Sequence, residues 1–286
     1  MVLLVRFGEI ALKSRYVRRQ LRDRLVGNVQ DLFASEAVEC VTEADEARVY
    51  VHTDDEARAR GILARVFGVV SMSPARETKA DLDALRALAL EESGRLLKPG
   101  QSFALRPRRT GSHPFSSQDL AKDIGRAILA AHPGSCVDLD GPDVEIHIEV
   151  RQNRGFVFHV VWPGPGGLPL GSQGRALAFV DSEAGMVAAW MGMKRGCRVT
   201  IASPDEGVHV EPLRRWDVHL KVLKADAPAG LEEGVRLARA DAVFLGTRWS
   251  EFAQAARPKL SVPIFEPVVG LSDDEIAGIG KAIRAA

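Results

Sequence analysis

The stretch RALAFVDSEAGMVAAWMGMKRGCRVTIA (residues 175–202) decides the fold class of the C-terminal part of the chain. Residues 175–180 predict a buried strand, residues 183–195 predict a helix that ends before Gly196, and residues 197–202 predict a second strand. Weaker strand and helix patterns continue this alternation toward the end of the sequence. Strands that alternate with helices form a parallel sheet with right-handed crossovers. We therefore expect an α/β domain with a parallel sheet.

The segment that leads into this domain, WPGPGGLPLGSQG (residues 162–174), is dense in proline and glycine, which predicts a linker. The first part of the chain alternates strand, helix, strand, helix and strand within about 75 residues. The second part has two helices, a strand and a hairpin of two alternating strands. Both patterns are typical of α+β units. We therefore expect three domains, over residues 1–74, 75–165 and 166–286.

The composition excludes several classes of protein. Lysine plus arginine and aspartate plus glutamate number 38 each, so the chain lacks the overall basic excess of a histone-like binder. No apolar run reaches the roughly 18–20 residues of a membrane helix, and the start has neither a basic n-region nor a cleavage site. The three cysteines lie far apart, which excludes a disulfide framework and a four-cysteine metal site within one chain. We expect a cytoplasmic protein that contacts no membrane and has no metal centre.

Positive charge is concentrated in the first 30 residues, although the whole chain is neutral. This segment has seven basic and two acidic residues, a surplus of 7 − 2 = +5. Five of the basic residues fall in a predicted amphipathic helix over residues 15–33. A neutral chain that concentrates charge usually uses it to bind a polyanion, and the alternative is an ordinary solvated helix face. The basic residues are Arg6, Lys13, Arg15, Arg18, Arg19, Arg22 and Arg24.

A second basic cluster lies in FALRPRRTGSHPFSS (residues 103–117), at the end of a predicted strand and in the loop before a predicted helix. Arginine side chains beside the free N–H groups of a helix N-terminus are suited to bind a phosphodiester. An aromatic ring in the same loop is suited to stack on an unpaired base. A solvated basic loop with an ordinary helix cap is the alternative. The candidate residues are Arg106, Arg108, Arg109, Thr110, His113, Phe115, Ser116 and Ser117.

Five segments resemble the tRNA 4-thiouridine synthetase family, whose members also supply sulfur for thiamine. RFGEIALKSR (residues 6–15) resembles the N-terminal ferredoxin-like signature, and residues 106–117 are similar to the signature of the THUMP domain. GPGGLPLGSQG (residues 164–174) resembles the linker into the ATP-pyrophosphatase (PP-loop) domain. VAAWMGMKRG (residues 187–196) and PIFEPVVGLSDDEI (residues 263–276) resemble the first helix and the closing segment of that domain. The matches occur in the family's order over nearly the whole chain.

This resemblance implies a fold and a partner. The implied fold is a ferredoxin-like domain, a THUMP domain and a Rossmann-like domain, in that order. The implied partner is tRNA, held at its acceptor stem and single-stranded CCA end, and the resemblance also allows a homodimer. By the same resemblance, the strongest tRNA contacts are Arg106, Arg108, Arg109 and Thr110. The concentration of charge in the first segment adds Lys13, Arg15, Arg18, Arg19 and Arg22 as further candidates.

The sequence departs from the family at the phosphate-binding loop. The family has S-G-G-x-D-S between the first strand and first helix of the third domain, whereas this chain has VDSEAG (residues 180–185). Two carboxylates there repel a polyphosphate by roughly one to a few kcal/mol. Binding of ATP together with Mg²⁺ remains an alternative, because two carboxylates can also hold Mg²⁺. In the plainer alternative, the two carboxylates only cap the helix. The residues of this candidate nucleotide site are Val180, Asp181, Ser182, Glu183, Gly185 and Gly246.

Other parts of the family's catalytic apparatus are also absent from the sequence. No cysteine follows Cys197 to carry a persulfide, there is no rhodanese-like extension, and no catalytic residue can be assigned. The first hypothesis is therefore a tRNA-binding protein without adenylation chemistry, which recruits a modification enzyme. The second is an active tRNA sulfurtransferase that makes 4-thiouridine at tRNA position 8 with an external sulfur donor. A small-molecule enzyme with a Rossmann-like site near residues 180–185 is the third.

Overall fold

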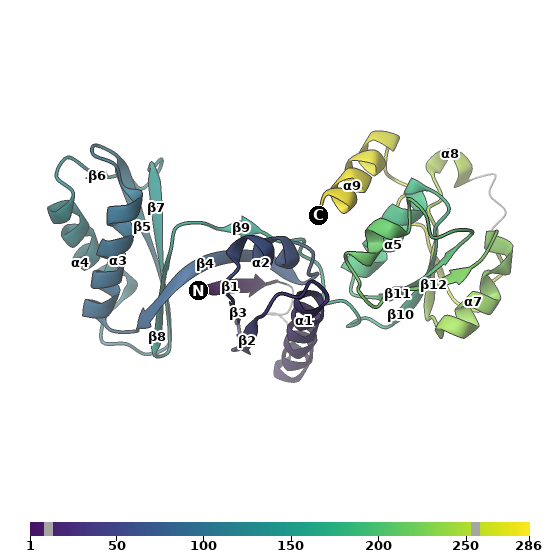
Figure 1. Ribbon diagram of the computed structural model, residues 1–286, viewed down its shortest axis with the longest axis horizontal. Helices are drawn as coiled ribbons and strands as arrows, with labels where there is room; N and C mark the ends of the chain where they lie inside the picture. Colours follow the sequence, from purple (N-terminus) through teal and green to yellow (C-terminus); the bar gives the residue numbers. More distant parts are fainter. Residues whose placement is uncertain (9–13, 253–257) are drawn as a thin grey trace. The chain divides into compact units, whose positions relative to one another are not determined.

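Figure 1 shows a computed structural model, which describes residues 1–8, 14–252 and 258–286. The chain forms two compact units. Unit 1 consists of Met1–Leu4, Tyr50–Asp54 and Ser73–Trp162. Unit 2 consists of Val5–Val49, Asp55–Met72 and Pro163–Ala286. The three domain boundaries expected from the sequence stay a prediction.

The strands of unit 1 belong to a mixed sheet, whose strand order includes β3-β1-β4-β8-β7-β5-β6. The pairs β4–β8 and β7–β8 are antiparallel, whereas β5 is parallel to both β6 and β7. The strand β9 pairs with β4, and β2 follows β3 at the other end. The bounds are β1 Val2–Phe7, β2 Val41–Ala44, β3 Arg48–His52, β4 Val69–Lys79, β5 Ser102–Thr110, β6 Cys136–Val137, β7 Val144–Arg151, β8 Arg154–Phe158 and β9 Trp162–Pro163.

Two helices, α3 (Leu82–Leu96) and α4 (Ser117–Ala131), pack against β5, β7 and β8. They bury an apolar cluster that includes Leu85, Phe103 and Ile146. The predicted hairpin is present, since β7 and β8 are joined by a two-residue turn, and Gln152 in this turn has a positive φ of 52°. This unit therefore has the α+β character that the sequence predicted.

Helix α1 (Arg15–Ser35) begins where the sequence predicted, because the Ser14 side chain accepts a hydrogen bond from the Val17 N–H. The predicted apolar stripe is buried at Leu21, Leu25, Val29 and Leu32, whereas Val17 is exposed. The shorter helix α2 (Glu56–Leu63) packs beside α1.

The C-terminal part of unit 2 is a parallel sheet of order β12-β11-β10-β13-β14. One apolar cluster, with α5 and α9, packs on one face, and a second, with α7, packs on the other. Helices on both faces of a parallel sheet are the Rossmann-like arrangement that the sequence predicted. The bounds are β10 Arg175–Phe179, α5 Glu183–Lys194, β11 Arg198–Ser203, α6 Glu211–Arg214, β12 Lys221–Lys224, a 3-10 turn Pro228–Gly230, α7 Leu231–Ala238, β13 Ala242–Phe244, α8 Trp249–Phe252, β14 Ile264–Phe265 and α9 Asp273–Ala285.

The proline- and glycine-rich linker is a structured segment of unit 2, which we call the strap (residues 164–174). Its backbone N–H groups at Gly164 and Gly166 donate to the carbonyl groups of Val70 and Val69, at 2.9 and 2.8 Å. Gly167 has a positive φ of 76°, and a Cβ there would lie 2.2 Å from a carbonyl oxygen of α5. Only glycine fits this close approach.

No helix among the described residues is long and apolar enough to cross a membrane.

Candidate nucleic-acid interface

The arginines at the end of β5 differ in what they contact. Side chains alternate along a strand, so Arg106, Arg108 and Thr110 share one face of the sheet. Arg106 is held by protein groups: its Nε and Nη2 lie 2.8 and 2.7 Å from a carboxylate oxygen of Glu145, and Nη2 donates to the Leu139 carbonyl at 2.8 Å. The predicted phosphate contact at Arg106 therefore competes with an internal ion pair.

Arg108 is the cation of this strand that is available to a ligand. Its side chain is exposed, and within the described residues it has neither an ion-pair partner nor a hydrogen-bond partner. Thr110 beyond it is also exposed. Neighbouring arginines of the sheet are paired, as Arg154 is with Glu77 at 2.5 Å. The structure thus singles out Arg108 for contact with an external anion.

Arg109 and His113 hold the loop in shape, and we call their interactions the loop clasp. Arg109 Nη1 donates to the Gly111 carbonyl at 2.7 Å, and His113 Nε2 lies 2.6 Å from the Gln152 carbonyl oxygen. Because a carbonyl only accepts, Nε2 is the protonated nitrogen. The other ring nitrogen, Nδ1, then accepts from Arg109 Nη1 at 3.4 Å. The clasp ties the β5–α4 loop to the β7–β8 turn.

Phe115 does not have the role that the sequence suggested. Its ring is only 8% exposed, belongs to the apolar cluster under α3 and α4, and stacks on His113 with ring centroids 5.5 Å apart. A ring in this position anchors the loop from below. This burial argues against stacking of Phe115 on an unpaired base, and its role in RNA binding stays a prediction.

The N-terminus of α4 is capped by its own residues. The Ser116 side chain accepts from the Asp119 N–H at 3.1 Å, and the Asp119 carboxylate accepts from the Ser116 N–H at 2.8 Å. The hydrogen bonds that the carboxylate accepts from the Ser116 N–H and the Ser116 hydroxyl lower the pKa of Asp119 and keep a negative charge at the helix start. At the predicted site of Ser116 and Ser117, an anion would therefore have to bind helix N–H groups outside this capping box. The sequence analysis missed Asp119, although it stands at the third helical position where such boxes close.

Two exposed cations on α4 were also missed. Lys122 and Arg126 are four residues apart, so they lie on the same face of the helix, and both are exposed. The signal for them was present, because the helix over residues 117–131 was predicted and its buried positions follow the helical period. We expect them to extend the positive surface of α4.

The basic residues predicted on α1 share one face, because they are spaced by three, four and seven positions. Arg19 and Arg22 both contact Asp23, at 3.7 and 2.7 Å. Arg15 lies 3.9 Å from Glu46, and both side chains are mostly exposed, so this pair is weak. The residues on this face are Arg15, Arg18, Arg19 and Arg22.

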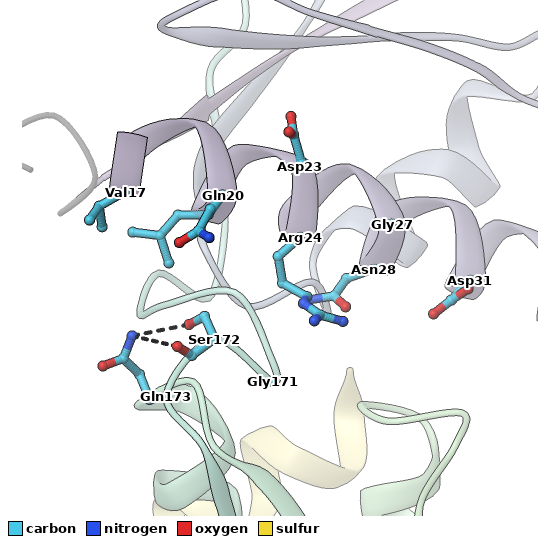
Figure 2. A pocket seen from close by; sticks show the side chains of 11 residues that line it. Val17, Gln20, Asp23, Arg24, Gly27, Asn28, Asp31, Gly171, Ser172 and Gln173 are labelled. Atoms are coloured by element: carbon cyan, nitrogen blue, oxygen red, sulfur yellow. Dashed lines mark hydrogen bonds between the residues drawn. The ribbon is translucent and has the colours of Figure 1, made fainter. Parts of the chain in front are cut away.

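Lys13, which was predicted with this group, lies outside the described residues. Arg24 belongs to another face of α1, where a groove of about 600 Å³ separates the helix from the strap (Figure 2). Figure 2 shows Gln20, Arg24 and Asn28 projecting from the helix toward Ser172 and Gln173 of the strap. The helical wheel places Arg24 opposite the predicted basic face, which is why the sequence analysis did not select this groove.

The candidate nucleotide loop is tightly packed at the start of α5, although Asp181, Ser182 and Gly246 line a pocket beside it. The Ser182 side chain accepts from the Gly185 N–H at 3.3 Å and so caps α5. Gly246 packs against the same turn so closely that a Cβ on it would lie 2.3 Å from the Gly185 nitrogen. Val180 is fully buried and its carbonyl accepts a hydrogen bond from Ser203. The open backbone cradle that a phosphate needs is therefore absent from these described residues.

The charge at this loop is also unfavourable for phosphate. Asp181 is exposed, and Glu183 is paired with Arg284 of α9 at 2.6 Å. The adjoining pocket of about 280 Å³ is lined by Asp181, Glu251 and Glu266. Among the described residues, no group of three acidic, cysteine or histidine side chains is arranged to hold a metal ion. The residues of this loop thus do not fit a polyphosphate.

Cys197 does not have the properties of a sulfur carrier. Burial raises the pKa of its thiol, against an opposing effect of the nearby Arg195. The thiol group also lies 3.7 Å from the Gln173 carbonyl oxygen. A thiol that stays protonated is a poor nucleophile.

Comparison with known proteins identifies two parts of the chain. The THUMP domain model matches residues 79–160, and the ThiI ferredoxin-like domain model matches residues 2–73. A probable tRNA sulfurtransferase of Methanothermobacter thermautotrophicus is 35% identical over 82% of this chain and 61% of its own length. The tRNA sulfurtransferase of Pyrobaculum aerophilum is 30% identical over 96% of this chain and 65% of its own length.

The chain belongs to the tRNA sulfurtransferase family. The chain spans between half and two thirds of the length of the curated relatives it matches. A Pyrococcus horikoshii protein of known structure is 27% identical, with a TM-score of 0.82 over 99% of both chains. A 4-thiouridine synthetase solved as an RNA complex with bound ATP shares the fold, with a TM-score of 0.77 over 99% of this chain and 84% of its own, at 19% identity.

Proposed function

We propose that this chain binds tRNA and holds its acceptor end for a modification reaction. The observation that carries the proposal is Arg108, an exposed and unpaired guanidinium at the end of β5, within the segment that matches the THUMP domain. A guanidinium is suited to bind a phosphate through two parallel hydrogen bonds. The names of the relatives, and the RNA complex of one similar structure, support tRNA as the polyanion.

The side chains of this surface divide into contacts and supports. Arg108, Thr110 and the cations of α4 are exposed and are the proposed contacts with the RNA backbone. Arg106 and the loop clasp of Arg109 and His113 keep the strand end and the loop in position. We expect α1 to add long-range attraction through its basic face.

We further infer that the C-terminal domain does not activate tRNA with ATP at residues 180–185. The closed turn at Gly246, the capped start of α5 and the carboxylates of the adjoining pocket all oppose a bound polyphosphate. The reaction would then depend on a separate modification enzyme as partner. The names of the relatives favour the alternative, an active tRNA sulfurtransferase with an external sulfur donor.

The test is a pair of titrations on the full chain. Fluorescence anisotropy with labelled tRNA at several salt concentrations is expected to show binding that weakens steeply as salt rises. Calorimetry with ATP and Mg²⁺ is expected to show no binding heat, and no AMP should form when tRNA is added. Absence of tRNA binding at low salt refutes the proposed function. Formation of AMP decides for the alternative, whereas unchanged 4-thiouridine in the tRNA of a strain lacking the gene removes the alternative.

A further inference from the structure

The groove between α1 and the strap is preformed, because hydrogen bonds fix both of its walls. The buried Asn28 amide donates to the Leu170 carbonyl at 3.1 Å, which ties the helix to the strap. The strap is held in turn from the other side, where the Leu168 and Gln173 N–H groups donate to carbonyl groups at residues 194 and 196, each at 3.0 Å. Binding of a ligand in this groove therefore carries no entropy cost for ordering the groove walls.

The available charge in the groove is positive. Arg24 is exposed and, in the part of the chain that the structure describes, has no ion-pair partner. Each of the two carboxylates that line the groove already has a partner. Asp23 is bound by Arg22 and projects away from the strap in Figure 2, and Asp31 lies 3.1 Å from a ring nitrogen of His219. An anionic occupant is thus favoured over a cationic one.

The other groups in the groove suit the base of a nucleotide. Gln20 lines the groove from the helix and Gln173 lines it from the strap, and each amide has two donor hydrogens and an acceptor oxygen. The bonds they make to Tyr16 and Ser172 use only part of this capacity. Val17 and Leu21 add apolar surface on the helix side. Unpaired bases are bound in this way, by apolar contact with the ring and hydrogen bonds to its edges.

We propose that this groove binds a single-stranded segment of RNA, with a phosphate on Arg24 and a base between the two glutamine amides. The inference rests on the proposed tRNA-binding function and adds a second contact, in unit 2. A volume of about 600 Å³ has the size of a typical ligand pocket and holds one or two nucleotides. A duplex is recognised on its outer surface and does not enter such a groove. The competing occupant is an acidic peptide of a partner protein.

Gly27 allows the groove to be filled without disturbing the core. It lies in the middle of α1 and lines the groove, and a Cβ added to it meets no atom within 4 Å. Gly27→Leu therefore places a side chain in the groove and replaces a poor helix former with a good one. Gly61→Leu in α2 is the matched control, because a Cβ there also meets no atom within 4 Å and Gly61 lies outside the groove.

Binding of a labelled eight-nucleotide single-stranded RNA, and of full tRNA, is measured by anisotropy for the wild type, Gly27→Leu, Gly61→Leu and Arg24→Ala. We expect Gly27→Leu and Arg24→Ala to bind the oligonucleotide about tenfold more weakly. Gly61→Leu should match the wild type, and neither leucine variant should lower the melting temperature. Arg24→Ala should also reduce the salt dependence of binding, because one phosphate contact is removed.

Unchanged affinity of both groove variants, with tRNA still bound and Arg108→Ala weakened, overturns the groove proposal and leaves the proposed function standing. If the wild type binds neither the oligonucleotide nor tRNA, the proposed function itself is refuted. Binding of a polyglutamate peptide that Gly27→Leu weakens, without an effect of Gly27→Leu on RNA, assigns the groove to an acidic protein partner and also overturns the proposal.

Discussion

Arg106 and Arg108 lie on the same strand but should have different roles. Replacing Arg106 should lower stability, and replacing Arg108 should weaken RNA binding. Arg106 makes an ion pair and a hydrogen bond to a carbonyl group in a half-buried position. Loss of these contacts in Arg106→Ala is expected to cost about 1–2 kcal/mol. For a protein of this size, that corresponds to a melting temperature lower by a few degrees. Affinity for tRNA should change by less than about twofold.

Arg108→Ala should have the opposite profile. Its side chain is exposed and contacts no partner among the described residues, so stability should change by less than about 0.5 kcal/mol. A lost contact between a guanidinium and a phosphate is worth about 1.5 kcal/mol, which is about tenfold in affinity. The slope of log K against log salt should fall by about 0.7–0.9, one phosphate contact.

The assay combines thermal melting with anisotropy of labelled tRNA between 50 and 200 mM salt, a range chosen because phosphate contacts weaken strongly across it (about 10³–10⁵-fold for six to ten contacts). Arg108→Lys is the control, since it keeps the charge but loses the planar fork, and it should keep the salt slope while losing part of the affinity. The reasoning fails if Arg106→Ala loses RNA affinity at an unchanged melting temperature. It also fails if Arg108→Ala melts early and binds normally.

The remaining predictions concern the loop clasp, a helix cap and the strap. His113→Gln keeps a donor for the β7–β8 turn and should retain RNA affinity, whereas His113→Ala should bind about tenfold more weakly; equal affinities would show that the clasp is not needed. Hydrogen bonds from Ser272 lower the pKa of Glu275, so this cap stabilises the fold above the ordinary glutamate pKa of about 4.3 and is lost as the pH falls through the lowered value. Glu275→Ala removes this carboxylate, so its melting temperature should lie below that of the wild type at pH 7 and approach it as the pH falls through the lowered pKa, and a difference that is constant with pH would contradict this. Gly167→Ala meets a carbonyl oxygen at 2.2 Å and should cost at least about 3 kcal/mol in urea unfolding, against about 1–2 kcal/mol for Gly166→Ala, which has open space; similar losses would refute the close approach.

Much of the fold was predictable because its signals are local. The strand–helix–strand pattern over residues 175–202 predicted a parallel sheet, and β10 and β11 pair in parallel as expected. The serine before the predicted basic helix does cap α1, and the hairpin between β7 and β8 was predicted from its turn. These features depend on neighbours in the sequence, which a single chain displays directly.

The candidate interface was less predictable because ion pairing and burial are set by residues distant in sequence. Arg106 is bound by Glu145, 39 residues later, and Phe115 is covered by helices whose packing the sequence does not display. The same holds for the α1–strap groove, whose walls are more than 140 residues apart. Lys122 and Arg126 could have been selected from the helical period alone.

The hydrogen bond from Asn28 to Leu170 spans 142 residues, and this separation has a consequence during synthesis on the ribosome. At about 5–20 residues per second, the nascent helix waits roughly 7–28 s for the acceptor of its buried amide to be made. Until then the amide of Asn28 lacks the acceptor that it has in the finished protein, so docking of α1 is completed late. A fragment that stops before residue 170, even one that contains the whole THUMP segment, would carry this helix without its final partner.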